Sequence, residues 1–325
     1  MKAVYVEQTG GIEMLKYGER PIPEPGAGEV LVKIAVSGVN FVDTYHRQGL
    51  YPMALPAILG SEAAGVVEKT GEGVAGFKPG DRVAYAMARG SYAEHHAVPA
   101  KFLVHLPEGV GLQDAAAVML QGMTAHYLSH ATFPLKPGHS ALIHAAAGGT
   151  GALLVQMAKM AGARVIATAG TPDKAEIARH AGADEVILYD QADWVAEVKK
   201  ATGGAGVDVV YDSVGRATFL KGLDCLKPCG MMVSFGQSSG PVEPITTLLL
   251  MNKGSLYVTR PTLGNHVGPE ALARSTSDLF RWMKEGKLKL RIDKTYPLAD
   301  ASQAQRDLEG RKSRGKLLLE VGVTA

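Results

Sequence analysis

The sequence has little cysteine: Cys225 and Cys229 are the only two among 325 residues. Three residues separate them, one of them Pro228, so they do not form a redox pair with two intervening residues, and no histidines lie at zinc-finger spacing. We therefore expect reduced thiols and a cytoplasmic location. The first residues alternate as a strand without an apolar signal core. No apolar run reaches the roughly 18 residues of a membrane span.

An excess of one charge is also missing. Lysine and arginine total 34 against 32 acidic residues, which gives a net charge of +2. The basic runs at 287–291 and 311–314 are short and typical of solvated helix ends. Without a polybasic surface or a platform of stacked aromatic residues, nucleic acid is not expected as the main partner.

Short alternating segments separated by glycine and proline predict a β-rich region at 1–122. Strands are expected at 29–39, 63–68, 82–86 and 91–98. The pattern changes near Gly122, after which strands and helices alternate at intervals of roughly 25–30 residues, as in a doubly wound parallel sheet. Strands of this sheet are expected at 141–144, 164–168, 185–188, 207–211, 231–235 and 255–259.

The carboxy-terminal segment, 261–325, is expected to hold two helices (270–285 and 299–309) and a final strand at 316–321. A piece this short cannot bury a core of its own. We therefore expect it to pack on the first region. The predicted domains are 1–122 with 261–325, and 123–260.

The strongest motif is the loop Ala145-Ala-Ala-Gly-Gly-Thr-Gly151, between a predicted strand and a predicted helix. Glycines such as Gly148, Gly149 and Gly151 let the backbone approach a pyrophosphate, and the helix start presents free amides. Alanines replace the earlier glycines of the usual G-x-G-x-x-G pattern. A tight turn without a ligand is the alternative, but five further strand units favour a dinucleotide site.

The end of the second strand indicates which cofactor binds. Sites that prefer NAD place an acid about 20 residues beyond the loop, on the ribose 2′-hydroxyl. Here 168–171 reads Thr-Ala-Gly-Thr, and Lys174 follows closely, whereas Asp173 suits the start of a helix. The sequence therefore predicts NADPH over NADH, and a solvated Lys174 remains the alternative.

Several blocks together resemble a known family. They are Gly38-Val-Asn-Phe-Val-Asp43, Arg47-Gln-Gly49, Gly60-Ser-Glu62, Gly76–Val83, Gly122-Met-Thr-Ala125, Tyr211-Asp-Ser-Val-Gly215, Ser234–Ser239 and Gly254–Pro261. Over essentially the whole chain they resemble the zinc-independent quinone oxidoreductases, the zeta-crystallin branch of the medium-chain dehydrogenase/reductase superfamily. The resemblance implies a GroES-like β-rich catalytic domain, a Rossmann domain, and NADPH-dependent reduction of quinones by a homodimer.

The resemblance also implies a shell of residues around NADPH. The catalytic domain would supply Asn40, Phe41 and Tyr45. The remainder would be Gly149, Gly170, Lys174, Tyr189, Ser213, Phe235, Ser238, Val258, Arg260 and Arg311, the last reaching back from the carboxy-terminal segment. For Ser213 and Val258, packing is the competing explanation.

No catalytic metal is expected. Where zinc alcohol dehydrogenases of the superfamily carry Cys and His ligands, this chain has Asn40 and Ser61. Without a Lewis acid, hydride delivery to an isolated ketone would leave an unstabilised alkoxide, whereas a reduced quinone is stabilised by resonance. The predicted substrate is therefore a quinone or another conjugated acceptor, and reduction of alkenals or enones is the alternative.

Five polar or aromatic residues are candidates for the acceptor site. Asn40 is expected to hydrogen-bond the nicotinamide or the substrate, and Tyr45 and Tyr51 to form an aromatic wall. Gln121 and Thr124 are candidates for the pocket floor. Tyr51 as a packing residue before Pro52 is the competing explanation. The apolar segment 255–259 should lie at a sheet edge, where two-fold pairing would give a homodimer.

Overall fold

The computed structural model describes residues 1–191 and 193–322. Contacts between residues divide the chain into two compact units. Unit 1 is formed by Met1–Met123 with Val267–Ala325, and unit 2 by Thr124–His266. Helix α2 (Leu112–Tyr127) passes from the first unit into the second. Among the helices of the described residues, none combines the length and apolar composition needed to cross a bilayer.

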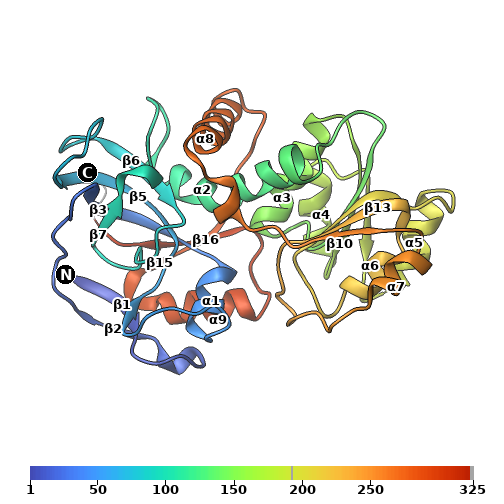
Figure 1. Ribbon diagram of the computed structural model, residues 1–325, viewed down its shortest axis with the longest axis horizontal. Helices are drawn as coiled ribbons and strands as arrows, with labels where there is room; N and C mark the ends of the chain where they lie inside the picture. Colours follow the sequence, from blue (N-terminus) through green and yellow to red (C-terminus); the bar gives the residue numbers. More distant parts are fainter. Residues whose placement is uncertain (192, 323–325) are drawn as a thin grey trace. The chain divides into compact units, whose positions relative to one another are not determined.

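Unit 1 contains two β-sheets (Figure 1). The smaller has the order β2-β1-β4, and the larger has the order β15-β16-β3-β5-β6-β8, with β7 paired to β3. The carboxy-terminal strand β16 (Lys316–Glu320) pairs antiparallel with β3 (Glu29–Val39). The last segment therefore completes the sheet begun by the first, as the sequence predicts. The other strands are β1 (Lys2–Val6), β2 (Lys16–Glu19), β4 (Ala57–Ile58), β5 (Glu62–Thr70), β6 (Arg82–Ala86), β7 (His95–Pro99), β8 (Leu103–His105) and β15 (Ile292–Pro297).

Alternation along β3 explains the core of unit 1. Val30, Val32 and Ile34 are buried in one apolar cluster with residues of β5, β6 and β7. Val39, at the end of the strand, is buried in a second cluster with Leu317 and Leu319 of β16. Burial of each such side chain contributes about 1.5–3 kcal/mol. The strand is thus held on both faces, and its end is a fixed platform for the residues that follow.

The short strands β2, β4 and β8 of unit 1 were not predicted, and three larger elements also differ from the prediction. Helix α1 (Phe41–Arg47) begins directly after β3, in a segment whose apolar residues resemble a continued strand. Helix α2 begins at Leu112 and continues through Gly122, where we expected a change of region. Strand β15 has a mostly exposed, polar sequence and was missed. The expected helices are present as α8 (Pro269–Lys284) and α9 (Ala301–Glu309).

Unit 2 contains one parallel sheet with the order β11-β10-β9-β12-β13-β14, which confirms the doubly wound prediction. The chain moves outward from β9 to β11 and then resumes at β12 on the other side of β9, so the order reverses there. The strands are β9 (Ser140–Ile143), β10 (Arg164–Ala169), β11 (Glu185–Leu188), β12 (Val207–Asp212), β13 (Leu226–Ser234) and β14 (Tyr257–Thr259).

Helices cover both faces of this sheet (Figure 1). Helices α3 (Gly149–Met160) and α4 (Pro172–His180) lie on one face. The other face carries α5 (Trp194–Ala201), α6 (Phe219–Leu223) and α7 (Thr247–Asn252), which share an apolar cluster with Leu142 and Ile166. Thr171 caps α4 by accepting the Lys174 amide, as predicted. Ligands of such sheets bind at the carboxyl ends of the strands, near the reversal of strand order.

Candidate functional site

The Gly-rich loop follows β9, at the carboxyl edge of the sheet in unit 2. Gly148 is the N-cap of α3, and no side chain caps the helix there. The first amides of α3 therefore point into the loop with the positive end of the helix dipole behind them. This is the arrangement that binds phosphate groups in proteins. Gly148, Gly149 and Gly151 thus lie at the start of α3, beside these amides.

Gly151 is required by a close contact between helix and loop. A Cβ atom at this position would lie 2.4 Å from the Ala145 carbonyl oxygen and 2.9 Å from Ala146 Cα, both backbone atoms. Ala145 itself has φ 50°, in the left-handed region that non-glycine residues rarely adopt. The loop is therefore bent tightly against α3. The glycine at position 151 thus allows the close packing of helix against loop that is typical of dinucleotide-binding turns.

A second loop at the same edge follows β12. Asp212 is fully buried, and its Oδ1 accepts the amides of Val214 (2.7 Å) and Gly215 (3.1 Å). The Ser213 carbonyl accepts the Ser238 amide at 3.1 Å. Together these bonds hold the two loops that follow the neighbouring strands β12 and β13. The predicted residues Ser213 and Ser238 are thus adjacent.

Phe235, a third predicted cofactor residue, directly follows β13, and its amide donates to the Asp212 carbonyl at 2.8 Å. The bond joins Phe235 to the same pair of loops. All three predicted residues of this region therefore share one end of the sheet.

Gly170 directly follows β10, and its neighbour is the Tyr189 side chain. A Cβ atom on Gly170 would lie 2.7 Å from the Tyr189 hydroxyl oxygen. Lys174 lies in the first turn of α4, close behind. The strand tip, Ala169, carries no acid. Three of the predicted 2′-phosphate residues are therefore close in the chain or in contact, at one end of β10.

Three predicted cofactor residues lie further out. Val258 is in β14, with 37% of its surface exposed, and Arg260 follows that strand, where its guanidinium donates to the Pro261 carbonyl at 3.4 Å. Arg311 belongs to unit 1, just after α9, and has φ 55°.

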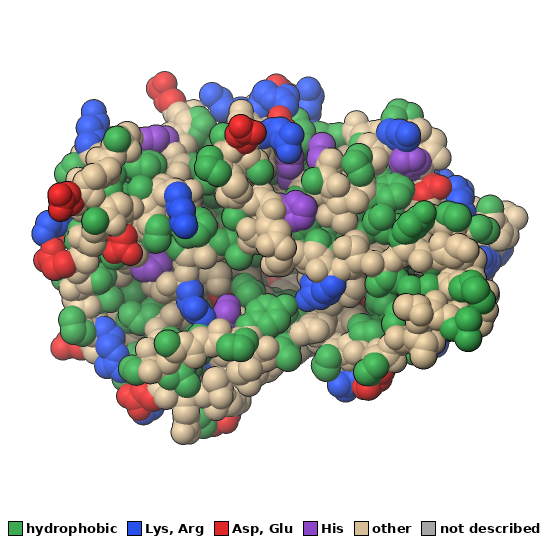
Figure 2. Space-filling model, in the orientation of Figure 1, with side chains coloured by type: hydrophobic (Ala, Val, Ile, Leu, Met, Phe, Trp, Pro, Cys, Tyr) green, Lys and Arg blue, Asp and Glu red, His purple; other side chains and the backbone are tan. Residues whose placement is uncertain are grey.

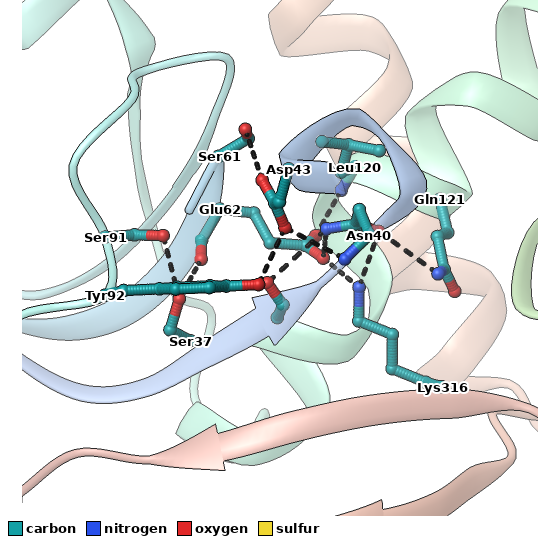
Figure 3. Close-up of polar contacts among 11 residues, drawn as sticks. Ser37, Asn40, Asp43, Ser61, Glu62, Ser91, Tyr92, Leu120, Gln121 and Lys316 are labelled. Carbon is teal, nitrogen blue, oxygen red and sulfur yellow. Dashed lines mark hydrogen bonds and ion pairs between the residues drawn. The ribbon is translucent and has the colours of Figure 1, made fainter. Parts of the chain in front are cut away.

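In unit 1, the predicted residue Asn40 lies in a buried polar cluster (Figure 3). Its Nδ2 donates to Glu62 Oε1 at 2.7 Å, and its Oδ1 accepts from Lys316 Nζ at 3.0 Å and from Gln121 Nε2 at 3.1 Å. Lys316 also forms an ion pair with Glu62. Glu62 Oε2 accepts the Leu120 amide at 2.7 Å. One buried carboxylate thus joins β5, α2, β16 and the start of α1.

Asp43 is a second buried carboxylate beside this cluster. Asp43 accepts hydrogen bonds from Ser61 Oγ (2.7 Å), from Tyr92 Oη (2.9 Å) and from the backbone N–H of Asn40 (2.9 Å). Burial raises the pKa of Asp43 from 3.8 to about 6, against the lowering effect of these three donors, and the nearby Glu62 carboxylate raises the pKa further. The folded protein therefore holds a proton on Asp43 in a pH range where an exposed aspartate is ionised.

We expect Asp43→Asn to change how stability depends on pH. Because the folded-state pKa of Asp43 is raised, its contribution to stability is lost as the pH rises from about 4 to about 6 and stays constant above. The non-titrating variant should therefore gain about 3 kcal/mol relative to wild type across this range. Urea unfolding at several pH values measures the difference. A pH-independent difference would contradict the raised pKa.

The aromatic candidates of unit 1 lie on and after α1. The rings of Tyr45 and Tyr51 are 5.4 Å apart in an edge-to-face arrangement, and the Phe41 ring is 6.2 Å from Tyr45. Tyr45 is 8% exposed and Tyr51 half-buried. The predicted aromatic wall is therefore a contiguous group. Thr124 follows in α2, as the first residue of unit 2.

Comparison with known proteins identifies the family. Residues 26–108 match the alcohol dehydrogenase GroES-like domain, and residues 149–277 match the zinc-binding dehydrogenases. The quinone oxidoreductase of Pseudomonas aeruginosa is 44% identical over 321 residues, covering 98% of this chain and 99% of the relative. The chain belongs to the quinone oxidoreductase family. The predicted GroES-like and Rossmann architecture is thereby confirmed.

Two further relatives bear on the chemistry of the family. A crystal structure of Escherichia coli quinone oxidoreductase complexed with NADPH superposes with a TM-score of 0.96 at 44% identity, covering 98% of this chain and all of the other. The 2-haloacrylate reductase of a Burkholderia species is 40% identical over 326 residues, covering 98% of each chain. The family thus includes a reductase named for an activated alkene.

This chain has neither a thiolate nor an imidazole at the two positions where zinc alcohol dehydrogenases carry zinc ligands, Asn40 and Ser61. Asn40 is bonded to Glu62, Lys316 and Gln121, and Ser61 donates to Asp43. Both side chains therefore serve bonds within the protein. Within residues 1–191 and 193–322, no group of three or more His, Cys, Asp or Glu side chains is placed to hold a metal ion.

Sequence reasoning missed Glu62 and Lys316 as members of this cluster. In the sequence, Glu62 stands out only as part of a family motif, and Lys316 only as the first residue of the expected final strand. The available signals were a carboxylate at the start of a mostly apolar strand and a lysine directly before three leucines. Both mark charges at positions that the strand pattern predicts to be buried.

Proposed function

We propose that this protein reduces quinones with NADPH, without a catalytic metal. The full-length identity to quinone oxidoreductases carries the proposal, and the Gly-rich loop with an uncharged strand tip at Ala169 supports it. NADPH supplies the hydride when bound. The acceptor is a quinone or another conjugated small molecule.

Residues of unit 2 would bind the cofactor. The first amides of α3 and the tight turn at Gly148, Gly149 and Gly151 suit the pyrophosphate. Gly170, Tyr189 and Lys174 suit the adenosine 2′-phosphate, because the strand tip has no acid to repel it. The paired loops with Ser213, Phe235 and Ser238 suit the nicotinamide half. Val258 and Arg260 of unit 2, with Asn40, Phe41, Tyr45 and Arg311 of unit 1, complete the proposed set.

Residues of unit 1 would orient the acceptor. The rings of Tyr45 and Tyr51 offer an apolar surface with hydroxyl tips, which suits a flat conjugated ring. Phe41 extends this surface. Gln121 and Thr124 would contribute polar contacts, and Asn40 would act through Gln121. These side chains would orient the acceptor and exclude water from it, and none of them needs to ionise.

We also propose a cytoplasmic homodimer made of two-domain chains divided near residues 122 and 261. The edge strand β14 has no second neighbour in its sheet among the described strands, and Tyr257 (58%), Leu248 (57%) and Met251 (58%) expose large apolar side chains. Two-fold pairing of this edge would cover them. Sedimentation as a monomer at micromolar concentration would count against the dimer.

The surface charge bears on the kind of partner. Acidic and basic side chains are interspersed over the face in Figure 2, which supports a small molecule rather than nucleic acid as the main partner.

Paired acceptor assays test the proposed reaction. Oxidation of NADPH should be fast with a benzoquinone and slower with an alkenal or 2-haloacrylate, and a zinc chelator should leave the rate unchanged. Preference for the alkene would favour the alternative, reduction of a conjugated double bond. Loss of activity together with one tightly bound zinc per chain would contradict the metal-free site.

Lys174→Ala should weaken NADPH binding and hardly affect NADH. A charge-assisted contact to a phosphate is worth about 1.5–3 kcal/mol, or roughly ten- to over a hundredfold in affinity. Ala169→Asp should shift the preference toward NADH by repelling the phosphate and accepting from the ribose. Fluorescence titration of both cofactors measures the effects. Equal weakening of NADPH and NADH by Lys174→Ala would assign the lysine no part in recognising the phosphate.

A further inference from the structure

The hydrogen-bond directions in the buried cluster of unit 1 are fixed by its two charges (Figure 3). Lys316 is 3% exposed and Glu62 is fully buried, and they form an ion pair. An ammonium group can only donate, and a carboxylate can only accept. Lys316 therefore faces Asn40 Oδ1, at 3.0 Å, and Glu62 faces Asn40 Nδ2, at 2.7 Å. The side-chain amide of Asn40 therefore has a single orientation, with Oδ1 toward Lys316 and Nδ2 toward Glu62.

The orientation of the Asn40 side chain determines the orientation of the Gln121 side chain. Asn40 Oδ1 presents an acceptor toward α2, so Gln121 must turn its amino group to it, and Nε2 donates at 3.1 Å. The other end of the Gln121 amide, Oε1, is buried and has no hydrogen-bond partner in the described chain. A buried acceptor without a partner costs free energy unless a ligand or water completes it. The charges at Lys316 and Glu62 thus determine that Gln121 offers an acceptor.

We propose that Lys316 and Glu62 are positioning residues that, through Asn40, set Gln121 Oε1 to accept a hydrogen bond from the bound ligand. The proposal rests on the proposed function. The ligand group must carry an N–H or O–H donor. Two groups of the reaction qualify, namely the carboxamide of the nicotinamide and the hydroxyl of the hydroquinone product. A quinone carbonyl does not qualify, because it only accepts.

Space around the pair supports a fixed arrangement. A Cβ atom on Gly38 would lie 2.0 Å from Glu62 Oε1, so the glycine leaves the room that the carboxylate fills. Glu62 Oε2 is also bonded to the Leu120 amide at 2.7 Å, directly before Gln121. The carboxylate therefore holds both the backbone beside Gln121 and, through Asn40, its side chain.

Three variants separate positioning from simple structural support. Gln121→Met removes the acceptor and leaves the ion pair intact. The neutral variant, Lys316→Met with Glu62→Gln, removes both charges together, so no charge stays buried alone and Asn40 can take either orientation. The relocated variant, Asn40→Asp with Glu62→Gln, moves the carboxylate to position 40, where it still accepts from Lys316 and Gln121. Aspartate is also as good a helix N-cap as asparagine.

The measurements are the Kd of NADPH, the inhibition constant of a hydroquinone, and the Tm of each variant. Gln121→Met and the neutral variant should weaken the same ligand by about tenfold. The relocated variant should bind that ligand at least about threefold more tightly than the neutral variant. Weakened NADPH assigns the contact to the carboxamide, and weakened hydroquinone assigns it to the product hydroxyl.

Three results would overturn the inference. Gln121→Met binding both ligands as wild type does would remove the acceptor role. A neutral variant that binds both ligands as wild type does would show that the charges of Lys316 and Glu62 do not determine how Gln121 binds the ligand. A relocated variant no better than the neutral one would show that the direction of the Asn40 bond is irrelevant. If the neutral variant does not fold, Asn40→Leu replaces it, because it keeps the ion pair and removes only the hydrogen bonds that link the pair to Gln121. Wild-type binding of both ligands by Asn40→Leu would also overturn the inference.

The proposed function can fail separately. Wild-type protein that binds NADPH but does not reduce quinones would contradict the function alone, because the NADPH titration still measures the role of Gln121.

Discussion

Gly38→Ala should destabilise the protein by about 3–5 kcal/mol, the usual effect of breaking a buried ion pair. The added Cβ would lie 2.0 Å from Glu62 Oε1 and 2.5 Å from Cδ, so the carboxylate must leave its place. Lys316 and Asn40 would then lose their partner inside the core. Urea unfolding at neutral pH measures the loss.

Gly18→Ala is the matched control. Gly18 also lies in a strand, β2, but the nearest atom to its added Cβ is Tyr5 Cε1 at 3.6 Å, an ordinary contact. This variant should unfold close to the wild-type midpoint. If Gly38→Ala is as stable as Gly18→Ala, the Glu62 cluster does not hold the sheet and α2 together.

Gly151→Ala should weaken NADPH binding by roughly ten- to a hundredfold, because it displaces backbone amides whose hydrogen bonds to a phosphate are worth about 1.5–3 kcal/mol. The contact atoms are backbone, Ala145 O at 2.4 Å and Ala146 Cα at 2.9 Å, so the loop and α3 must separate. The phosphate-binding amides then no longer converge. Fluorescence titration with NADPH measures the change.

Gly222→Ala provides the comparison within unit 2. This glycine is also helical, in α6, but its added Cβ meets the Met232 side-chain methyl at 2.7 Å, the flexible end of a side chain. Affinity for NADPH should stay near that of wild type. A Gly151→Ala variant that binds NADPH as tightly as Gly222→Ala does would place the cofactor away from the Gly-rich loop.

Local patterns predicted most of unit 2. Each strand of its sheet falls within a few residues of the expected range, because parallel strands are continuous apolar runs bounded by turns. β13 begins earlier than expected, at Leu226, because it continues through Pro228 and Gly230, which look like a turn in the sequence. The loop 145–151 and the cap at Thr171 were readable because each depends on neighbours in the chain.

The cluster of unit 1 could not be read from the sequence in the same way. Lys316 and Glu62 are 254 residues apart, and charged residues are rarely buried, so neither position suggests the other. The sequence predicts that Asn40 contacts a ligand, but it gives no sign of the hydrogen bonds from its side-chain amide to three side chains of the protein. Only the fold shows that its side chain connects an ion pair to Gln121.

The most direct test of the account is quinone-dependent oxidation of NADPH by the purified protein. We expect one NADPH consumed for each benzoquinone reduced to hydroquinone, with kcat/KM for NADPH at least about tenfold above that for NADH. A rate no faster than the uncatalysed reaction, or equal use of NADH and NADPH, would contradict the assignment of this chain as an NADPH-dependent quinone reductase.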